Sequence, residues 1–575
     1  MSSEPPNERL LVARPGAVRV MGARWAFWRA QHGCDAHALS QAEAVLLRYA
    51  QEFRTEPELL ALARDHARMP GEVAAATLRR LMDLGIVAEL DAFLPEGGED
   101  SAGPPPVVAI RTCNRAGALS RLVESILAHA RAEGSVREYV VVDDSLDPTA
   151  RAAARASADR LRQGVSVPAR YFGAEDANAL ASELARLVPT ERRESLFSLL
   201  DPGARNAPRT GARAWNLALL LSAGRTLSIL DDDTVFPLRH PPGSDVRFDL
   251  SSSYDRETRW FDEPGAPGRL PIVPGDPFEY ASRFLGRTPG ALFARDGCDR
   301  RSAHGRGVGA VSHLTRTARV AAAFPGTYGG ITFDSAVYFN TASASTVDEL
   351  LRAPYRHERL EGDDAWQGAL QPRIVPHAMY TPLLLDNRTL RPFAGTFGKS
   401  DDTLFLHLMK AMDPEALFVF LAAAIGHYPV EARDRTARSL QPAITDANNF
   451  LVLCVSDVLP LLRSSDPAER LAFIGAYFEE LARASEGRLA DAVFAWRDTV
   501  YAGIVVRMGE VLERRPDAPE QWRRYAEQVL RVNRDALCER SLAPEYFLRL
   551  RATLRQAADA AAVWPLLWRH CAERG

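Results

Sequence analysis

The sequence predicts an α/β core between a small N-terminal helical or winged-helix-like domain and an all-α C-terminal domain. Short helical patterns occupy residues 1–94, apolar strands and helices alternate over 107–402, and residues 403–575 are almost continuously helical in pattern. Residues 95–106 mix proline, glycine and acidic residues, which is typical of a surface linker. A chain of 575 residues is too long for a single core, so several domains are expected.

The N-terminal region carries apolar residues at helical spacing in three segments, 39–53, 56–69 and 71–87. The third segment has Gly85 in the position of a helix C-cap, followed by the apolar pair Ile86 and Val87. Three short helices and a strand predict a winged-helix-like unit. The arrangement resembles the peptide-recognition domain of enzymes that modify ribosomally made peptides. No diagnostic residue carries that resemblance, so a helical cap on the core is the favoured interpretation.

Composition limits the partners and the compartment of the protein. A net charge of −4 and a pI near 6.4 provide no basic field for nucleic acid or an anionic membrane. The 6 cysteines are scattered without metal-ligand spacing, which favours reduced thiols in a cytoplasmic protein. The N-terminus has no apolar signal-peptide core, and the longest apolar run, 416–426, is shorter than the roughly 20 residues of a membrane helix. We therefore expect no transmembrane segment.

A strand–turn–helix–strand unit begins the α/β region. Residues 107–110 are an apolar strand that leads to Thr112 and Arg115, and after an amphipathic helix the strand 139–142 ends in Asp143 and Asp144. In open α/β sheets, ligands bind beyond the carboxyl ends of such strands. A carboxylate there can accept hydrogen bonds from a base or from ribose hydroxyls. The alternative is that Asp143 and Asp144 only cap the next helix.

The strongest motif follows a second strand. An apolar helix begins near Gly211 with Arg213 and Asn216 in its first turns, and the strand 226–230 then ends in Asp231, Asp232 and Asp233. Three carboxylates at the end of a buried strand repel one another unless a cation neutralises them. Hard oxygen ligands favour Mg²⁺ or Mn²⁺, which also bind a diphosphate. A solvated loop is the usual alternative for such a triplet, but its place after the two strands argues against that here.

Four passages in this order resemble the successive motifs of family 2 glycosyltransferases and other enzymes of the GT-A fold: IRTCNRAGALSRLVESI, YVVVDDSLD, GARAWNLALLLSAG and ILDDDTVFP. The resemblance covers residues 107–236 and fades beyond them. It implies a nucleotide-sugar donor, most commonly a UDP sugar, and a Mn²⁺ or Mg²⁺ cofactor. The implied donor-binding residues are Thr112, Arg115, Asp143, Asp144, Arg213, Asn216, Asp231 and Asp232, and the implied metal ligands are Asp231 and Asp233.

An inverting transfer also needs a base near the acceptor hydroxyl. Two acidic pairs are candidates, Asp363–Asp364 and Asp401–Asp402. The second pair lies in LDNRTLRPFAGTFGKSDD, which resembles a passage of related glycosyltransferases, so the expected base is Asp402, then Asp401. Capping of the following helix is the structural alternative for this pair. His407, one helical turn later, is a candidate metal ligand or acceptor contact, although a lone histidine on an amphipathic helix more often packs.

Two further segments are candidates for substrate contacts in a glycosyltransferase. The arginine-rich stretch 295–306 could be a loop that closes on the diphosphate, and the segment 326–341, with Asp334, could form a bend near the acceptor. The sequence thus predicts a metal-dependent glycosyltransferase that acts on an unidentified acceptor hydroxyl, with a peptide or a glycan as candidate acceptors. The alternatives are a non-catalytic scaffold that binds a nucleotide and a peptide, and a nucleotidyltransferase, which the absence of a lysine-bearing phosphate loop opposes.

Overall fold

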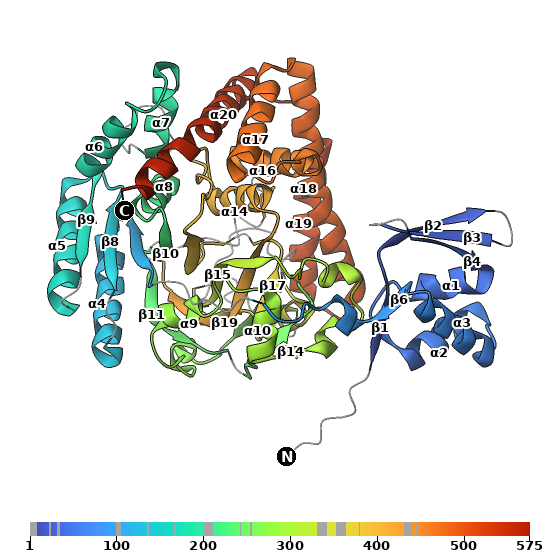
Figure 1. Ribbon diagram of the computed structural model, residues 1–575. Helices are drawn as coiled ribbons and strands as arrows, with labels where there is room; N and C mark the ends of the chain where they lie inside the picture. Colours follow the sequence, from blue (N-terminus) through green and yellow to red (C-terminus); the bar gives the residue numbers. More distant parts are fainter. Residues whose placement is uncertain are drawn as a thin grey trace.

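The structure is a computed structural model of the 575-residue chain. It describes residues 9–21, 25–31, 35–98, 105–134, 137–165, 168–200, 211–241, 243–253, 256–330, 342–351, 364–378, 380–429, 440–442 and 446–574. The fold is mixed α/β, as expected, and it is built on a 13-stranded mixed sheet with helices on both faces (Figure 1).

The first half of the large sheet is parallel. Strands β9, β8, β7 and β10 are adjacent in that order, so the chain runs outward from β7 to β9 and then returns to place β10 on the other side of β7. The elements of this half are β7 (Val107–Thr112), α4 (Ala116–Glu133), β8 (Glu138–Asp143), α5 (Pro148–Val165), β9 (Ala169–Phe172), α6 (Ala174–Leu184), a 3-10 turn (Thr190–Arg192), α7 (Arg193–Leu200), α8 (Ala212–Leu221) and β10 (Arg225–Asp231). Strand β11 (Thr234–Arg239) follows and pairs antiparallel with β19 of the other half. The space between the carboxyl ends of β7 and β10 is therefore a topological switch point, the place where open α/β sheets bind ligands.

The two faces of β7 pack on different helices because successive side chains of a strand point in opposite directions. Val107 and Ala109 join a core with α8, α14 and the C-terminal helices, whereas Val108 and Ile110 join a core with α4 and α5. Burial on both faces explains why these strands are continuous apolar runs in the sequence.

The second half of the sheet mixes directions. Strand β18 is antiparallel to both β10 and β15, and β15 runs parallel to β19. The elements are β12 (Phe248–Asp249), β13 (Glu257–Trp260), a 3-10 turn (Ala266–Arg269), α9 (Pro277–Ser282), α10 (Pro289–Asp296), β14 (Cys298–Asp299), 3-10 turns (Arg300–Ala303 and Val308–Ala310), β15 (Arg319–Gly329), α12 (Ala344–Leu350), β16 (Ala365–Gly368), β17 (Arg373–Val375), β18 (Leu384–Asn387), α14 (Asp401–Met412) and β19 (Ala416–His427).

Strand β19 corrects the expected domain boundary at Asp402. Residues 403–575 were expected to be helical throughout, but β19 lies inside the large sheet and pairs with β15, β17 and β11. Its run of apolar residues has no alternation because both faces are buried, and such a run cannot be told from a buried helix by periodicity. The α/β region therefore extends to His427.

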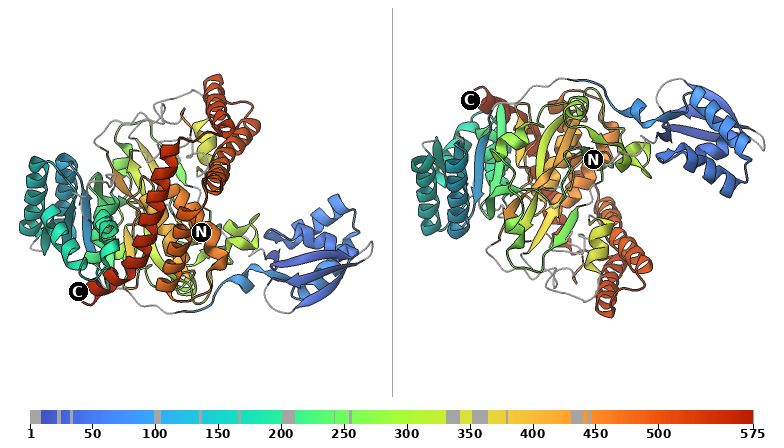
Figure 2. Two further views of the ribbon diagram at one scale, coloured as in Figure 1. Left: turned by 90° about the horizontal axis from the view of Figure 1, so that it is seen from above. Right: turned by 90° about the horizontal axis from the view of Figure 1, so that it is seen from below.

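The C-terminal helices begin at Ala447. They are α16 (Ala447–Val458), a 3-10 turn (Leu459–Leu461), α17 (Pro467–Arg483), α18 (Glu486–Arg514), α19 (Glu520–Cys538) and α20 (Pro544–Ala572). Helices α16, α17 and α20 and the first part of α18 pack on the sheet side that carries α8 and α14, whereas the rest of α18 and α19 form a separate core with α12. Helix α20 contacts α17, α7 and α8, so it crosses the molecule from the helical layer to the parallel half of the sheet (Figures 1 and 2). Asn387 on β18 accepts a hydrogen bond from the Trp568 indole, which fixes this crossing.

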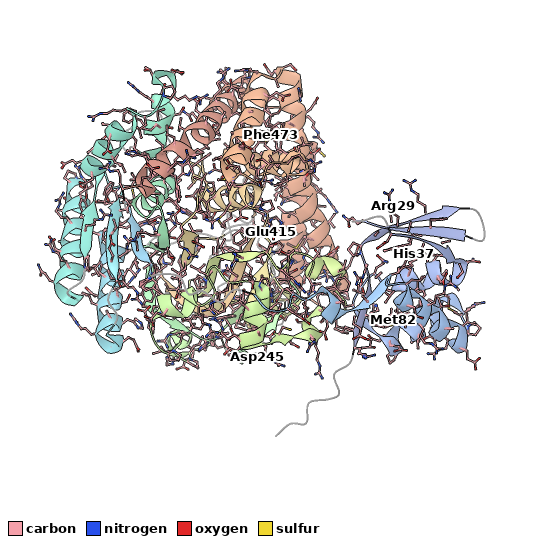
Figure 3. The ribbon with its side chains drawn as sticks, viewed as in Figure 1. Arg29, His37, Met82, Asp245, Glu415 and Phe473 are labelled. Carbon is pink, nitrogen blue, oxygen red and sulfur yellow. The ribbon has the colours of Figure 1, made fainter. Side chains whose placement is uncertain are left out.

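The N-terminal unit stands to one side of the rest of the chain (Figure 2). Its three helices lie where the sequence predicts them, and β6 overlaps the strand expected at Ile86 and Val87, but the other strands were not predicted. The elements are β1 (Leu10–Ala13), β2 (Gly16–Met21), β3 (Trp25–Ala30), β4 (Ala36–Ser40), α1 (Gln41–Tyr49), β5 (Arg54–Thr55), α2 (Glu56–Ala67), α3 (Gly71–Asp83), β6 (Val87–Glu89) and a 3-10 turn (Leu90–Phe93). Arg29 and His37, labelled in Figure 3, lie on neighbouring strands of the antiparallel sheet β2–β3–β4.

Two properties of the described residues bear on the earlier expectations. None of the helices in the described part of the chain is long and apolar enough to cross a membrane. The described cysteines at 113, 298, 454, 538 and 571 are free thiols.

Candidate functional site

The ends of β7 and β10 and the start of α14 converge on the guanidinium of Arg111. Its Nε donates to Asp231 Oδ1 at 3.0 Å, and its Nη2 contacts the same oxygen. A side chain at Gly211, next to α8, would lie 3.3 Å from Arg111 Nη1 and 3.8 Å from Asp401 Oδ2, so both groups border this glycine. The pKa of Arg111 is raised overall, because the effect of the carboxylates of Asp231, Asp401 and Asp402 exceeds the opposing effect of burial. Arg111 thus lies between two acidic motifs. Their first members in this cluster, Asp231 and Asp401, are 170 residues apart in the sequence.

The other two aspartates of the triplet are anchored rather than exposed. Thr112 Oγ1 donates to Asp232 Oδ2 at 2.8 Å, and Arg115 Nη1 lies 3.4 Å from Asp232 Oδ1 and 3.3 Å from Asp233 Oδ2. Burial raises the pKa of Asp232 to about 6, with the charge of Asp233 adding to the effect and the Thr112 hydrogen bond opposing it. The Asp231 side chain is 38% exposed, against 5% and 6% for the other two. Asp231 is therefore the member of the triplet best placed to meet a ligand.

Asp401 and Asp402 form the first turn of α14. The Thr403 backbone N–H donates to Asp402 Oδ1 at 2.7 Å. This hydrogen bond stabilises the carboxylate, but it is outweighed by burial and by the charge of Asp401. Both side chains keep some access to solvent, yet protein atoms surround them closely. Burial first, and then the neighbouring charge of Asp401, raise the pKa of Asp402 to about 7. Burial also raises the pKa of Asp401, while Arg111 opposes the shift. A carboxyl group with a pKa near neutrality can exchange a proton at physiological pH.

The backbone is strained on both sides of this cluster. Asn114, just after β7, has φ of 56°, and Ser400, just before α14, has φ of 61°. The left-handed region is unfavourable for residues with a Cβ, more so for serine than for asparagine, and such residues gather at functional sites.

At the end of β8, the structure gives Asp143 a structural role. Tyr171 donates its hydroxyl to Asp143 Oδ2 at 2.8 Å, and the Ser145 N–H donates to Oδ1 at 2.9 Å. Asp143 is 3% exposed, so the expectation that it contacts a nucleotide is not supported. Asp144 lies one residue further on, and its Oδ2 is 3.4 Å from Nη2 of Arg213. Asp144 and Arg213 are therefore paired at the end of β8, which keeps them as candidates for the donor side.

Asn216 is also structural, which corrects its expected role in donor binding. Its side-chain N–H groups donate to the carbonyls of Leu199 and Ala394, and its Oδ1 accepts the Ala394 N–H at 2.7 Å. The side chain is fully buried. Asn216 thus ties α8 to the segment that leads to Asp401, and this partner is 178 residues away in sequence.

Replacing Asn216 by leucine is expected to lower the free energy of unfolding by about 2–4 kcal/mol, because the Ala394 amide and two carbonyls would lose their partner in the interior. Urea unfolding followed by circular dichroism measures this. A variant that is as stable as the wild type but defective in donor binding would instead support the role expected from the sequence.

The contacts of His407 do not support its expected role as a metal ligand. Its Nδ1 faces the Thr403 carbonyl of its own helix at 2.8 Å, and its ring stacks on that of His377 at 6.1 Å. Burial lowers the pKa of His407, as it does for a packing residue. The histidine that does approach the triplet is His427, whose Nε2 is 3.8 Å from Asp233 Oδ2.

Sequence reasoning missed both His427 and Arg111. His427 ends the apolar run that was read as part of the helical region, so the available signal was a polar residue at the end of a buried strand. Arg111 precedes Thr112 within the first motif, and only the fold brings it to Asp231.

Among the remaining candidates, Asp364 and the arginine-rich stretch make contacts outside the cluster. Asp364 accepts the Gly265 N–H at 2.6 Å, while Asp363 and Asp334 lie outside the described residues. In the arginine-rich stretch 295–306, two side chains contact the N-terminal unit: Arg300 Nε donates to Asp91 Oδ1 at 2.8 Å, and His304 Nε2 lies 2.8 Å from Glu58 Oε2. Arg300 and His304 therefore contribute to domain docking.

The described residues do not form a complete metal site by themselves. No group of three histidine, cysteine, aspartate or glutamate side chains among them is arranged to hold an ion. Asp233 and His427 are a two-residue set, so a cation there would need further ligands from a bound substrate. Arg111 and Arg115 already place positive charge on the triplet.

Comparisons with known proteins add no relationship to this geometry, because no protein-family model, curated protein or solved structure matches the chain.

Proposed function

We propose that the protein is a glycosyltransferase with a GT-A core, which transfers a sugar from a nucleotide donor, of the UDP type, to an acceptor hydroxyl. The observation that carries the proposal is that Arg111 links Asp231 to the Asp401–Asp402 pair at the switch point between β7 and β10. A sugar transferase needs both a site for a diphosphate and a base for an acceptor, and these two motifs supply one each.

In this proposal the donor lies along the ends of β7, β8 and β10. Asp144, paired with Arg213, lies beside the nucleotide, and the exposed carboxylate of Asp231 accepts hydrogen bonds from ribose or sugar hydroxyls. Arg115 lies beside the diphosphate, where its guanidinium can move from Asp232 and Asp233 to the phosphate oxygens. Thr112 holds Asp232 in place and acts indirectly.

Asp402 takes the role of general base. It accepts the proton of the acceptor hydroxyl as the hydroxyl oxygen forms a bond to the anomeric carbon, and the bond between that carbon and the diphosphate oxygen breaks. The electron pair leaves with the nucleoside diphosphate. Arg111 stabilises the ionised form of the Asp401–Asp402 pair and so keeps the base available near neutral pH.

A Mn²⁺ or Mg²⁺ ion fits the site only together with the donor. Asp233 and His427 would hold it, and the diphosphate would complete the set. Such an ion supplies positive charge for the leaving diphosphate.

The test is release of nucleoside diphosphate from a panel of UDP, GDP and other nucleotide sugars by the full-length protein, with Mn²⁺, Mg²⁺ or EDTA. Turnover of at least one donor is expected. A wild-type protein that neither binds nor hydrolyses any donor would contradict the proposal, and release of pyrophosphate from nucleoside triphosphates would favour a nucleotidyltransferase.

The N-terminal unit suggests a peptide as acceptor or partner. In the described part of this unit, β4 pairs with β3 on one side only, and an extended peptide can add to such an edge through backbone hydrogen bonds. A full-length protein that binds a peptide and a nucleotide without turnover would support the scaffold alternative.

A further inference from the structure

Trp215 on α8 is a fully buried tryptophan beside the acidic cluster. The centre of its ring lies 4.9 Å from the guanidinium carbon of Arg111 and 4.9 Å from the centre of the Phe405 ring on α14. The same ring therefore contacts both the arginine near the end of β7 and the helix that begins at Asp401.

These contacts follow from the spacing of residues on the two helices. Side chains four residues apart lie on the same face of a helix, one above the other. Gly211, whose carbonyl accepts Arg111 Nη1 at 3.4 Å, is four residues before Trp215. Phe405 is likewise four residues after Asp401. One face of α8 thus carries the residues that approach Arg111 and the acidic end of α14.

Stacking on an aromatic ring leaves the N–H groups of a guanidinium available in its plane. Arg111 Nε uses this plane to donate to Asp231 Oδ1, and the charges of Asp401 and Asp402 also act on the guanidinium. The Trp215 ring occupies one face of the guanidinium and so restricts its movement away from these carboxylates. Without the ring, Arg111 could turn toward solvent together with Asp231, whose side chain is 38% exposed.

The indole hydrogen bonding indicates that this position uses the ring face of tryptophan. Within the described part of the chain, Trp215 Nε1 has no hydrogen-bond partner. By contrast, Trp564 donates its indole N–H to the Arg391 carbonyl at 2.6 Å. Trp568 donates to Asn387 Oδ1 at 3.0 Å. A buried donor without an acceptor destabilises the fold, a cost that phenylalanine would avoid, but tryptophan has the strongest cation–π face.

We propose that Trp215 is a positioning residue whose ring holds the guanidinium of Arg111 against Asp231 and the Asp401–Asp402 pair. The contacts that support this role need no assumption about the reaction. That the cluster contains the base of a sugar transfer rests on the proposed function.

The charges around Asp402 give the loss of this contact a definite direction. Burial and the charge of Asp401 raise the pKa of Asp402 to about 7, and Arg111 opposes them. Asp231 and Asp446, which begins α16, place further negative charge on Asp401. If Arg111 moves away from the pair, the pKa of Asp402 therefore rises.

The test follows the thermal unfolding midpoint of the full-length protein in EDTA as a function of pH, with and without Asp402→Asn. The stabilisation by Asp402→Asn grows with pH until Asp402 is fully ionised, so the pH at which it levels off reports the pKa of that residue. With Trp215→Leu, this levelling pH is expected to be at least about 0.5 pH units higher than in the wild type. The substitution leaves an apolar space that stays dry, so the burial of Asp402 persists.

Two variants separate the aromatic face from packing in general. Trp215→Phe keeps a ring and should show less than half the shift of Trp215→Leu. Trp522→Leu removes an equally buried tryptophan from the separate core of α12, α18 and α19, so it should leave the levelling pH unchanged. Trp215→Met also lacks a ring but fills more space, and it serves if Trp215→Leu does not fold. In an Arg111→Met background, Trp215→Leu should add no further shift.

An unchanged or lower levelling pH in Trp215→Leu would overturn the proposal. So would an equal shift in Trp215→Phe or in Trp522→Leu, because the aromatic face beside Arg111 would then not be the cause. A further shift in the Arg111→Met background would mean that Trp215 does not act through Arg111, and would overturn it as well. The experiment contains no nucleotide sugar, so a failure of the donor assay leaves its result unaffected.

Discussion

Replacing Asp402 by asparagine is expected to reduce sugar transfer by about 10²–10⁴-fold while making the protein more resistant to heat at pH 8. The loss follows from removal of the general base, whose contribution is of that order. The gain follows because burial raises the pKa of Asp402 to about 7, so its charged form destabilises the folded state. Asparagine has nearly the same shape and no charge. Transfer rates and thermal midpoints measured on the same samples check both effects.

The pH dependence has a definite sign. An acid with a raised pKa in the folded state weakens stability as the pH rises above its ordinary value near 3.8, and the effect is complete above about 7. The stabilisation by Asp402→Asn should therefore be present at pH 8, where we expect a gain of at least about 2 °C, and vanish near pH 4. Transfer by the wild type should rise with pH through about 7, because the base must be ionised.

Asp364→Asn is the matched control. It makes the same chemical change in an aspartate that was an alternative base, but its carboxylate accepts the Gly265 N–H instead of joining the cluster. We expect wild-type transfer from this variant. If Asp402→Asn remained fully active while Asp364→Asn lost activity, the base would have been assigned to the wrong acidic pair.

Replacing Asp233 by asparagine is expected to lower donor turnover by about 10²–10³-fold, since the charge that develops on the leaving diphosphate would lose its bound cation. His427→Ala removes the neighbouring ligand and is expected to raise the metal concentration needed for half-maximal turnover on the order of tenfold. Donor turnover titrated with Mn²⁺ measures both. Arg115→Ala distinguishes loss of a metal ligand from loss of positive charge beside Asp233. It removes the Arg115 cation but neither proposed ligand.

Two results would contradict the metal assignment. Full activity of the wild type in EDTA would mean that Arg111 and Arg115 supply the positive charge without an ion. An unchanged metal requirement in both Asp233→Asn and His427→Ala would place the ion elsewhere.

The sequence by itself determined the α/β core, the two strands with polar residues at their ends, and the acidic triplet after the third. These features depend on local pattern: apolar strands buried on both faces read as continuous runs, and polar residues mark where such strands end. The helices α1, α2 and α3 have amphipathic spacing or capping residues that are equally local.

Only the tertiary structure decided which polar residues serve the site and which hold the fold. Asn216 and Asp143 occupy motif positions, but their side chains form hydrogen bonds with Ala394 and Tyr171. Spacing along the chain does not reveal these partners. Arg111 and His427 reach the triplet because β7 lies beside β10 and because β19 pairs with β11, just after the triplet. Strand pairing joins segments about 120 to 190 residues apart through hydrogen bonds whose register no local pattern encodes. For that reason the acidic residues could be found in the sequence, while their partners could be found only in the fold.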